Sequence, residues 1–239
     1  MRAILLAAGC GTRLRPLTDS IPKCLVPING RPLLDYWLQY LTEAGIGPLL
    51  VNVHYLPDLV SNFVKSSSFS LNVSIVYEAE LLGTGGTLLR NRRFFDNEPV
   101  MLIHADNLCK CNLSDFIESH KNRPEHTEMT MMLFDTPSPS TCGIVELDEE
   151  RVVQKFHEKV SNPPSNLANG AVYIVEPTVV DFVATLKKSV IDFSTEILPH
   201  YLGRINTWRN AIYHRDIGNM ESWAAAQIEF NEIALQNKY

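Results

Sequence analysis

Short apolar segments alternate with helical patterns through the first 135 residues of this chain, and that alternation restricts the folds it can adopt. Apolar runs predict strands at residues 2–8, 48–54, 73–77, 99–104 and 128–134. Some runs, such as Val100-Met101-Leu102-Ile103, are apolar throughout, which is typical of parallel strands buried on both faces. Because a strand–helix–strand repeat joins parallel strands through right-handed crossovers, the pattern predicts an α/β fold with a doubly wound, mostly parallel sheet.

Helical spacing is clearest between the first two predicted strands. Four apolar residues recur there at steps of three and four, and they are Leu34, Trp37, Leu38 and Leu41. Gly45 is placed to end that helix. The same spacing predicts further helices around residues 59–64, 84–95 and 113–120.

The pattern changes after Pro137. The predicted elements are short paired strands at 143–147 and 152–156, a loop at 161–165, strands at 171–175 and 208–214, and a helix at 177–187. Asn219 is placed to cap a final helix, whose apolar face holds Trp223, Ala226, Phe230 and Ile233. No long linker divides the chain, so we expect one domain over residues 1–239, with parts 1–135 and 136–239 and a small antiparallel insertion in the second part.

Composition excludes several classes of protein. The 27 acidic residues outnumber the 21 basic ones, which disfavours nucleic acid as a partner. A hydrophobic content of 45% argues against intrinsic disorder, and no apolar run is long enough for a transmembrane helix or a membrane partner. The segment before Gly9 is too short for a signal peptide, and the five cysteines lack a disulfide spacing. A reduced, cytoplasmic location is therefore expected.

A glycine-rich segment follows the first predicted strand, with Gly9 and Gly11 ahead of Arg13. In α/β sheets, such a turn at the carboxyl end of a strand binds phosphates. Leu14 stands where a dinucleotide fingerprint has its third glycine, and no Gly-Lys-Ser/Thr follows, so neither that fingerprint nor a P-loop is present. Three nearby cations, Arg13, Arg15 and Lys23, suit a triphosphate, although a plain strand-to-helix turn with solvated basic residues fits the composition equally well.

Several ordered motifs resemble those of the sugar-1-phosphate nucleotidylyltransferases, also called NDP-sugar pyrophosphorylases. The longest is Leu6-Ala7-Ala8-Gly9-Cys10-Gly11-Thr12-Arg13-Leu14-Arg15-Pro16-Leu17-Thr18, followed by Pro22-Lys23. The others are Leu82-Gly83-Thr84-Gly85-Gly86, His104-Ala105-Asp106-Asn107, Phe156-His157-Glu158-Lys159, Asn169-Gly170-Ala171-Val172-Tyr173 and Asp216-Ile217-Gly218-Asn219-Met220-Glu221-Ser222-Trp223. The departures from the family pattern, at Cys24, Ala105, Asn219 and Met220, remove no charged group. The resemblance implies the Rossmann-like sheet of the nucleotide-diphospho-sugar transferases.

The resemblance also implies a reaction, in which a sugar-1-phosphate and an NTP give an NDP-sugar and pyrophosphate. A sugar-phosphate oxygen attacks the α-phosphorus in line, so the protein must align two anions and neutralise their charge. The catalytic residues implied are Arg13, Lys23 and Asp106, with Mg²⁺ as cofactor on Asp106 and Asp216. The nucleotide-binding residues implied are Ala8, Gly9, Gly11, Thr12, Arg13, Lys23, Gly83 and Thr84. The sugar-phosphate-binding residues implied are Gly143, Glu158, Lys159, Asn169 and Gly170.

The substrates are less well determined than the reaction. The motifs are most like those of mannose-1-phosphate and heptose-1-phosphate guanylyltransferases, which favours GTP, and a carboxylate at Glu78 or Glu80 can accept from guanine. A solvated strand edge explains either glutamate equally well. A thymidylyl- or uridylyltransferase acting on glucose-1-phosphate or an amino sugar-1-phosphate is an alternative. A catalytically silent nucleotide-sugar-binding regulatory subunit is another, and homo-oligomerisation is left open.

Overall fold

The computed structural model describes residues 1–236, and its backbone divides into two compact units. The first unit contains residues 1–4, 81–103 and 112–211, and the second contains residues 5–80, 104–111 and the chain from 212 onward. Strand β1 (Arg2–Leu6) therefore begins in the first unit and ends in the second. The division at residue 135 that the sequence suggests stays a prediction.

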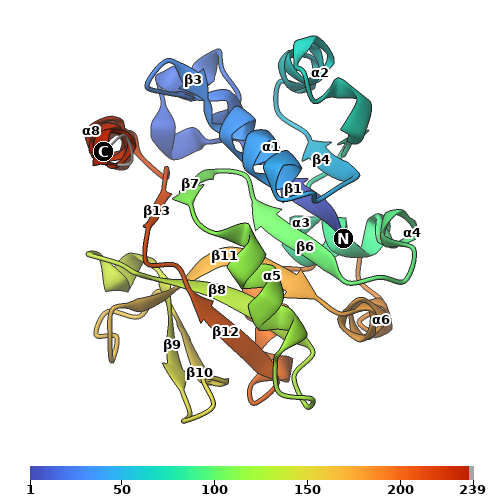
Figure 1. Ribbon diagram of the computed structural model, residues 1–239. Helices are drawn as coiled ribbons and strands as arrows, with labels where there is room; N and C mark the ends of the chain where they lie inside the picture. The colour runs from blue at the N-terminus through green and yellow to red at the C-terminus, as the bar shows by residue number, and fades with distance from the viewer. Residues whose placement is uncertain (237–239) are drawn as a thin grey trace. The chain divides into compact units, whose positions relative to one another are not determined.

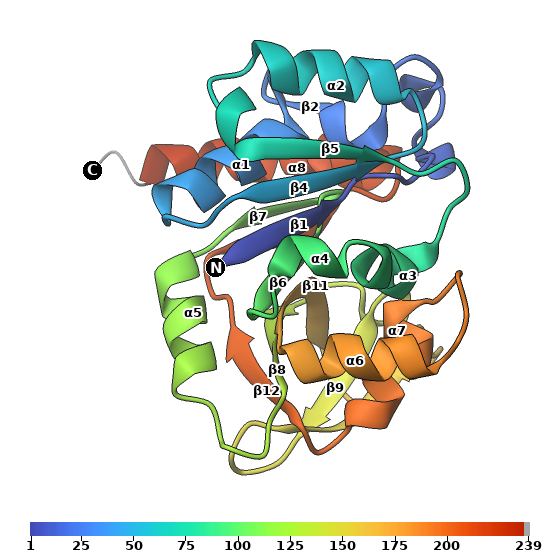
Figure 2. The ribbon, with the colours of Figure 1, turned by 90° about the vertical axis from the view of Figure 1, so that its right-hand side faces the viewer.

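The second unit contains a parallel pair of strands, β4 (Leu49–Val53) and β5 (Val73–Tyr77), with Leu49 opposite Val73. All five residues of β4 are buried, as its nearly continuous apolar sequence predicts. Helix α2 (Pro57–Ser66) connects the two strands and lies along them (Figure 2). Helix α1 (Leu33–Glu43) buries Leu34, Trp37, Leu38 and Leu41, the face that the helical spacing predicts.

Two antiparallel ribbons complete the second unit. Strands β2 (Pro27–Ile28) and β3 (Arg31–Pro32) form one, and β7 (Asn107–Lys110) and β13 (Tyr213–Asp216) form the other. Asp216 lies opposite Asn107 in the second ribbon. This register brings two segments that are far apart in the sequence side by side.

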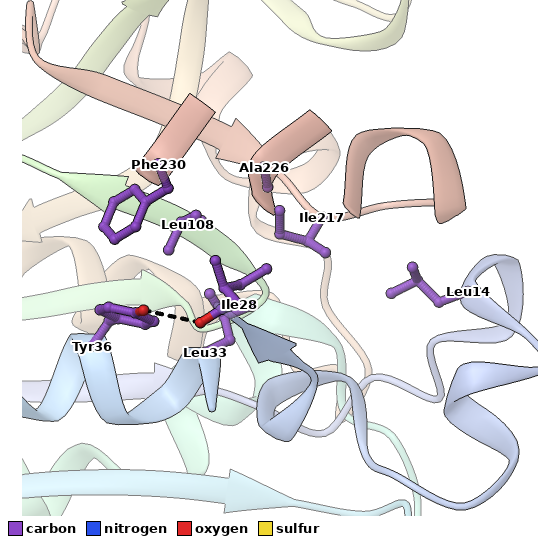
Figure 3. Packing of buried hydrophobic residues seen from close by; sticks show 8 residues of the cluster. All are labelled: Leu14, Ile28, Leu33, Tyr36, Leu108, Ile217, Ala226 and Phe230. Carbon is purple, nitrogen blue, oxygen red and sulfur yellow. Dashed lines mark hydrogen bonds between the residues drawn. The ribbon is translucent and has the colours of Figure 1, made fainter. Parts of the chain in front are cut away.

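One hydrophobic cluster joins the loops and helices of this unit (Figure 3). Its buried members are Leu14, Ile28, Leu33, Tyr36, Leu108, Ile217, Ala226 and Phe230. The last two lie on helix α8 (Met220–Gln236) and Trp223 packs against the cluster, so the apolar face predicted for the final helix is confirmed at these three positions. Asn219 caps this helix as predicted, because its Oδ1 accepts from the Ser222 N–H at 2.8 Å. Leu14, Leu108 and Ile217 thus anchor three polar segments to one core.

The first unit is built around strand β11 (Leu167–Val175), which pairs antiparallel with β6 (Val100–His104), β8 (Met129–Asp135) and β9 (Gly143–Leu147). β9 forms a hairpin with β10 (Val153–Glu158), and β12 (Ile205–Arg209) runs parallel to β8. The helices are α3 (Gly83–Arg90), α4 (Arg92–Phe95), α5 (Leu113–Lys121), α6 (Pro177–Thr185) and α7 (Phe193–Glu196). Helix α5 packs beside β8 and β12 (Figure 1). The predicted α/β class with a small antiparallel portion is confirmed.

Two predicted elements differ from the structure. The helix expected over 84–95 is divided at Asn91 into α3 and α4. The single strand expected over 208–214 is wrong, because β12 ends at Arg209 and β13 begins at Tyr213. Ala211 and Ile212 made that segment look continuously apolar, but both are exposed where the chain passes from the first unit to the second. Within residues 1–236, no helix has both the length and the apolar character needed to cross a membrane.

Candidate active site

A buried lysine bridges two carboxylates in the second unit. The Nζ atom of Lys23 lies 2.6 Å from Oδ2 of Asp106 and 3.5 Å from Oδ1 of Asp216. The Lys23 side chain is only 9% exposed, whereas the Asp106 and Asp216 side chains are 36% and 53% exposed. One shielded ammonium therefore faces two carboxylates that remain open to ligands.

The backbone explains why these three side chains meet. Asp106 occupies the turn between β6 and β7, and Asp216 is the last residue of β13, which pairs with β7. The Ile217 N–H donates to the Asp106 carbonyl at 3.3 Å and closes this end of the ribbon. Lys23 begins a short 3₁₀ turn, in which the Val26 N–H donates to its carbonyl at 3.2 Å. Each charged residue is thus held by local backbone hydrogen bonds.

The electrostatics favour an ionised Asp106. Burial raises the pKa of this carboxyl, but the neighbouring Lys23 ammonium and the charge of His104 more than offset that effect, so the pKa lies below its usual value. Two carboxylates with outward-facing oxygens form a hard-ligand pair of the kind that Mg²⁺ takes together with water and phosphate oxygens. Among the described residues no cluster of three or more His, Cys, Asp or Glu side chains forms a closed metal cage. The residues present therefore fit a magnesium ion shared with a substrate.

The glycine-rich loop, defined here as residues 7–18, lies beside this cluster. Gly11 has a φ of +62°, and a Cβ atom there would lie 3.0 Å from the Thr18 side chain and 3.1 Å from that of Lys23. Both the conformation and the space therefore require glycine. The Thr18 hydroxyl donates to the Gly11 carbonyl at 2.7 Å and fixes the turn.

Arg13 extends the charged cluster. Its Nη2 atom lies 3.5 Å from the position that a Cβ would take on Gly218, and Oδ2 of Asp216 lies 2.7 Å from that same position. A side chain at position 218 would therefore clash with the Asp216 carboxylate and lie close to the Arg13 guanidinium. The Arg13 side chain is exposed, unlike that of Lys23, so it is available to a ligand.

The Gly83–Gly86 segment of the first unit packs tightly against Ile191. The Gly85 and Gly86 N–H groups donate to the Ile191 carbonyl at 2.9 and 3.2 Å, and Thr84 Oγ1 accepts from the Phe193 N–H at 2.8 Å. Gly83 has a φ of +71°, and its Cβ position lies 2.5 Å from the Ile191 carbonyl oxygen. These glycines allow a close backbone approach that the sequence motif alone does not reveal.

Replacing Gly83 with alanine should lower the free energy of unfolding by about 2 kcal/mol or more, because a left-handed backbone strain adds to a clash with Ile191. Denaturant unfolding measures this loss. Gly203→Ala is the matched control in the same unit, since Gly203 has a φ of +79° but nothing within 4 Å of its Cβ position. Equal losses in the two variants would show that the Ile191 contact contributes nothing.

The residues expected around the sugar phosphate gather in two places of the first unit. Gly143 lies opposite Glu158 in the β9–β10 hairpin, and its Cβ position would lie 2.4 Å from the Phe156 ring and 2.9 Å from Oε2 of Glu158. Lys159 follows with a φ of +50°, and its exposed Nζ lies 3.2 Å from Oε1 of Glu158. This hairpin end therefore presents one carboxylate and one ammonium together.

Asn169 lies at an irregularity in β11. Its Nδ2 donates to the Tyr173 hydroxyl at 2.6 Å, and its Oδ1 accepts from the Ala171 N–H at 2.9 Å. The register shifts between Asn169 and Tyr173, and Ala171 has a φ of +52°. Burial raises the pKa of the Tyr173 hydroxyl, which keeps it neutral. Sequence reasoning missed Tyr173 as a partner of Asn169.

The predicted site residues fall into one set in each unit. The second unit holds Ala8, Gly9, Gly11, Thr12, Arg13, Lys23, Asp106 and Asp216, and the first holds Gly83, Thr84, Gly143, Glu158, Lys159, Asn169 and Gly170. Glu80 is exposed, whereas Glu78 is buried, so a solvated strand edge does not describe Glu78. A further buried polar residue of the second unit, Asn52, was also missed. The one signal for it is a single polar side chain in an otherwise apolar strand.

Comparison with known proteins supports a single family. A family model described as "Nucleotidyl transferase" matches residues 2–232. Mannose-1-phosphate guanylyltransferase of Mycobacterium tuberculosis is 31% identical over 226 residues, which cover 92% of this chain and 62% of that protein. The chain spans about half to three fifths of the length of the curated relatives it matches.

Solved structures share the fold. The structure of HddC from Yersinia pseudotuberculosis complexed with GMP-PN has a TM-score of 0.81 at 24% identity, covering 96% of this chain and 99% of that one. A UDP-glucose pyrophosphorylase complexed with UDP-glucose has a TM-score of 0.79 at 21% identity, covering 97% and 98%. These likenesses confirm the mixed, mostly parallel α/β sheet. Since the family model covers nearly the whole sequence, including every motif on which the resemblance rests, this chain belongs to the nucleotidyl transferase family.

Proposed function

We propose that this protein transfers a nucleotidyl group from an NTP to a sugar-1-phosphate and releases pyrophosphate. The observation that carries the proposal is the buried Lys23 ammonium between Asp106 and Asp216, next to a glycine-rich loop that bears Arg13. A fixed cation beside two open carboxylates suits a reaction in which two phosphate groups must approach each other. The family assignment supports the same class of chemistry.

The reaction needs alignment more than proton transfer. An oxygen of the sugar phosphate, already anionic, forms a bond to the α-phosphorus while the bond to the pyrophosphate oxygen breaks. Lys23 is proposed to neutralise the α-phosphate and Arg13 the leaving pyrophosphate. Lys159 is proposed to hold the incoming sugar phosphate. Holding both substrates in line lowers the entropic part of the barrier.

The remaining residues are proposed to orient the substrates. Backbone amides of Gly9, Gly11 and Thr12 would bind phosphate oxygens, since glycine lets the main chain approach a ligand closely. Ala8, Gly83 and Thr84 would contact the base. The residues proposed for the sugar hydroxyls and its phosphate are Gly143, Glu158, Asn169 and Gly170.

Asp106 and Asp216 are proposed to hold Mg²⁺. When bound, the ion supplies positive charge to phosphate oxygens and stabilises the negative charge that develops on them. The low pKa of Asp106 keeps that ligand ionised near neutral pH. Lys23 contacts both carboxylates and adds a cation that does not depend on the metal.

GTP with mannose-1-phosphate or a manno-heptose-1-phosphate is the proposed substrate pair. Several relatives at about 30% identity carry the name mannose-1-phosphate guanylyltransferase or guanyltransferase, and HddC was crystallised with GMP-PN. The exposed Glu80 carboxylate is suited to accept hydrogen bonds from guanine's N–H groups. A uridylyl- or thymidylyltransferase is the second candidate, favoured by the likeness to a structure with UDP-glucose.

A substrate matrix tests this function. The purified chain is mixed with each of four NTPs and a panel of sugar-1-phosphates, and pyrophosphate release is measured with and without Mg²⁺. We expect release with GTP and a manno-configured sugar phosphate, and none when the sugar phosphate or the metal is omitted. Preference for UTP or dTTP would select the second candidate. Nucleotide binding with no release in any combination would indicate a catalytically silent subunit and overturn the proposal.

A further inference from the structure

A buried asparagine in β4 ties the start of the glycine-rich loop to the neighbouring strand. Asn52 is 2% exposed, and its Oδ1 accepts from the Ala7 N–H at 2.8 Å. Its Nδ2 donates to Oε1 of Glu78 at 3.1 Å, and Glu78 is 1% exposed. Ala7 is the first residue after β1, so this contact lies where the chain turns into the loop.

We propose that Asn52 is a positioning residue for the nucleotide site, and that Glu78 fixes the orientation of its amide group. The inference rests on the proposed function, because it assigns a role to the loop that would bind the triphosphate. It concerns residues that touch the loop backbone and do not themselves contact the reacting atoms.

The hydrogen-bonding types of the three groups determine the orientation. Oε1 of Glu78 accepts the hydrogen bond from Asn52, so the Asn52 amide turns its NH₂ group toward Glu78. The amide oxygen then faces Ala7, whose backbone N–H can only donate. A flipped amide would set two donors against each other at Ala7 and two acceptors against each other at Glu78. Unpaired polar groups of this kind are costly in a buried setting.

Glu78 is itself fixed by the backbone. Its N–H donates to the Val53 carbonyl at 2.9 Å, and its carbonyl lies 2.8 Å from Nδ1 of His54. Both contacts join the ends of β4 and β5, two strands that already pair in parallel. Because the Glu78 main chain is fixed, its carboxylate is well placed to determine the orientation of the Asn52 amide.

The peptide bond between Leu6 and Ala7 connects this network to the charged cluster. Its N–H donates to Asn52, and its carbonyl accepts from the Ala105 N–H at 3.1 Å. Ala105 directly precedes Asp106, so one peptide plane is held between Asn52 and the Asp106 turn. Hydrogen bonds to both the N–H and the carbonyl fix the orientation of this peptide plane. That orientation in turn determines the backbone direction in which the loop begins after β1.

The C-terminal end of the loop is held by Tyr55, which follows strand β4. The Tyr55 hydroxyl donates to the Thr18 carbonyl at 3.0 Å, and the Thr18 hydroxyl donates to the Gly11 carbonyl. The chain from Asn52 to Tyr55 therefore fixes both ends of residues 7–18. Loss of Asn52 would free the Ala7 end of the loop and leave the Thr18 end in place. We then expect the backbone N–H groups of the loop to be less well aligned for binding phosphate oxygens.

Asn52→Leu tests the proposal, since leucine is of similar size and makes no hydrogen bond. We expect the KM for the NTP to rise about tenfold, while the KM for the sugar-1-phosphate stays within about twofold. Hydrogen exchange of the Ala7 amide gives a second readout that needs no turnover. We expect the exchange to be about tenfold faster in the variant, because the Ala7 N–H loses its acceptor.

A double variant that exchanges the amide and the carboxylate between positions 52 and 78 separates the effect of amide orientation from the effect of packing. Asn52→Asp alone faces one carboxylate with another, and we expect it to lose Ala7 protection and thermal stability. Adding Glu78→Gln restores a donor, because the new glutamine amide can donate to the new aspartate carboxylate, which still accepts from the Ala7 N–H. We expect the double variant to recover the Ala7 protection and most of the affinity for the NTP.

Asn91→Leu is the matched control for losing a buried asparagine. Asn91 is buried in the first unit, and its Nδ2 donates to the Thr87 carbonyl at 2.8 Å. It should lower stability without changing Ala7 exchange. Unchanged Ala7 exchange in Asn52→Leu, or a double variant no better than Asn52→Asp, would overturn the positioning role. Altered exchange in a protein that releases no pyrophosphate would contradict the proposed function and leave the loop contact standing.

Discussion

Replacing Lys23 with methionine should lower kcat/KM by about three orders of magnitude and leave the protein folded. Methionine keeps most of the length of the side chain but removes the ammonium that contacts Asp106 and Asp216. Because the Lys23 side chain is 9% exposed, water cannot take over its role without reorganising the site. Pyrophosphate release measures the loss, and circular dichroism reports the fold.

A second measurement separates lost chemistry from lost structure. Removing the ammonium leaves two carboxylates without their shared cation, so Lys23→Met should bind Mg²⁺ more tightly than the wild type when calorimetry is done without substrates. Lys65→Met is the matched control, because Lys65 is an exposed lysine on α2 in the same unit. It should change neither the rate of pyrophosphate release nor the affinity for Mg²⁺. If Lys23→Met retained turnover within about tenfold of wild type, the proposed catalytic role of Lys23 would be refuted.

The family resemblance implied that Asp106 and Asp216 share a metal ion, but the sequence did not predict how the two residues meet. They approach through the β7–β13 ribbon, in which Asp216 lies opposite Asn107. The structure brings both to Lys23. That Lys23 contacts both carboxylates was not predictable, because a side-chain contact between distant segments depends on the register of β7 and β13.

Other features depended on three-dimensional packing that no local pattern records. Nothing in the sequence links Asn52 to Glu78, and only the parallel pairing of β4 with β5 sets them side by side. The predicted strand over 208–214 was wrong because Ile212, although apolar, lies in the connection between β12 and β13, where its side chain is 50% exposed. Hydrophobic periodicity reports average burial, and it fails where a short exposed connection is apolar.

The second large effect is expected for Asp106→Asn, which should reduce turnover by about a thousandfold at saturating substrates and weaken Mg²⁺ binding. Asparagine keeps the shape, and its amide oxygen can still accept from Lys23, but the charge that would hold the ion is gone. Asp216→Asn is the matched comparison. Its carboxylate is more exposed and lies 3.5 Å rather than 2.6 Å from the Lys23 ammonium.

The smaller burial of Asp216 and its longer distance from Lys23 lead us to expect a smaller loss for Asp216→Asn, partly recovered at high Mg²⁺. A charge at the less shielded position is screened by water and salt, whereas Asp106 interacts with Lys23 at close range. Titrating Mg²⁺ against pyrophosphate release in both variants measures the difference. Near-normal release in Asp106→Asn would refute the metal assignment, and equal losses with equal magnesium dependence would show that the two carboxylates act as equivalent ligands.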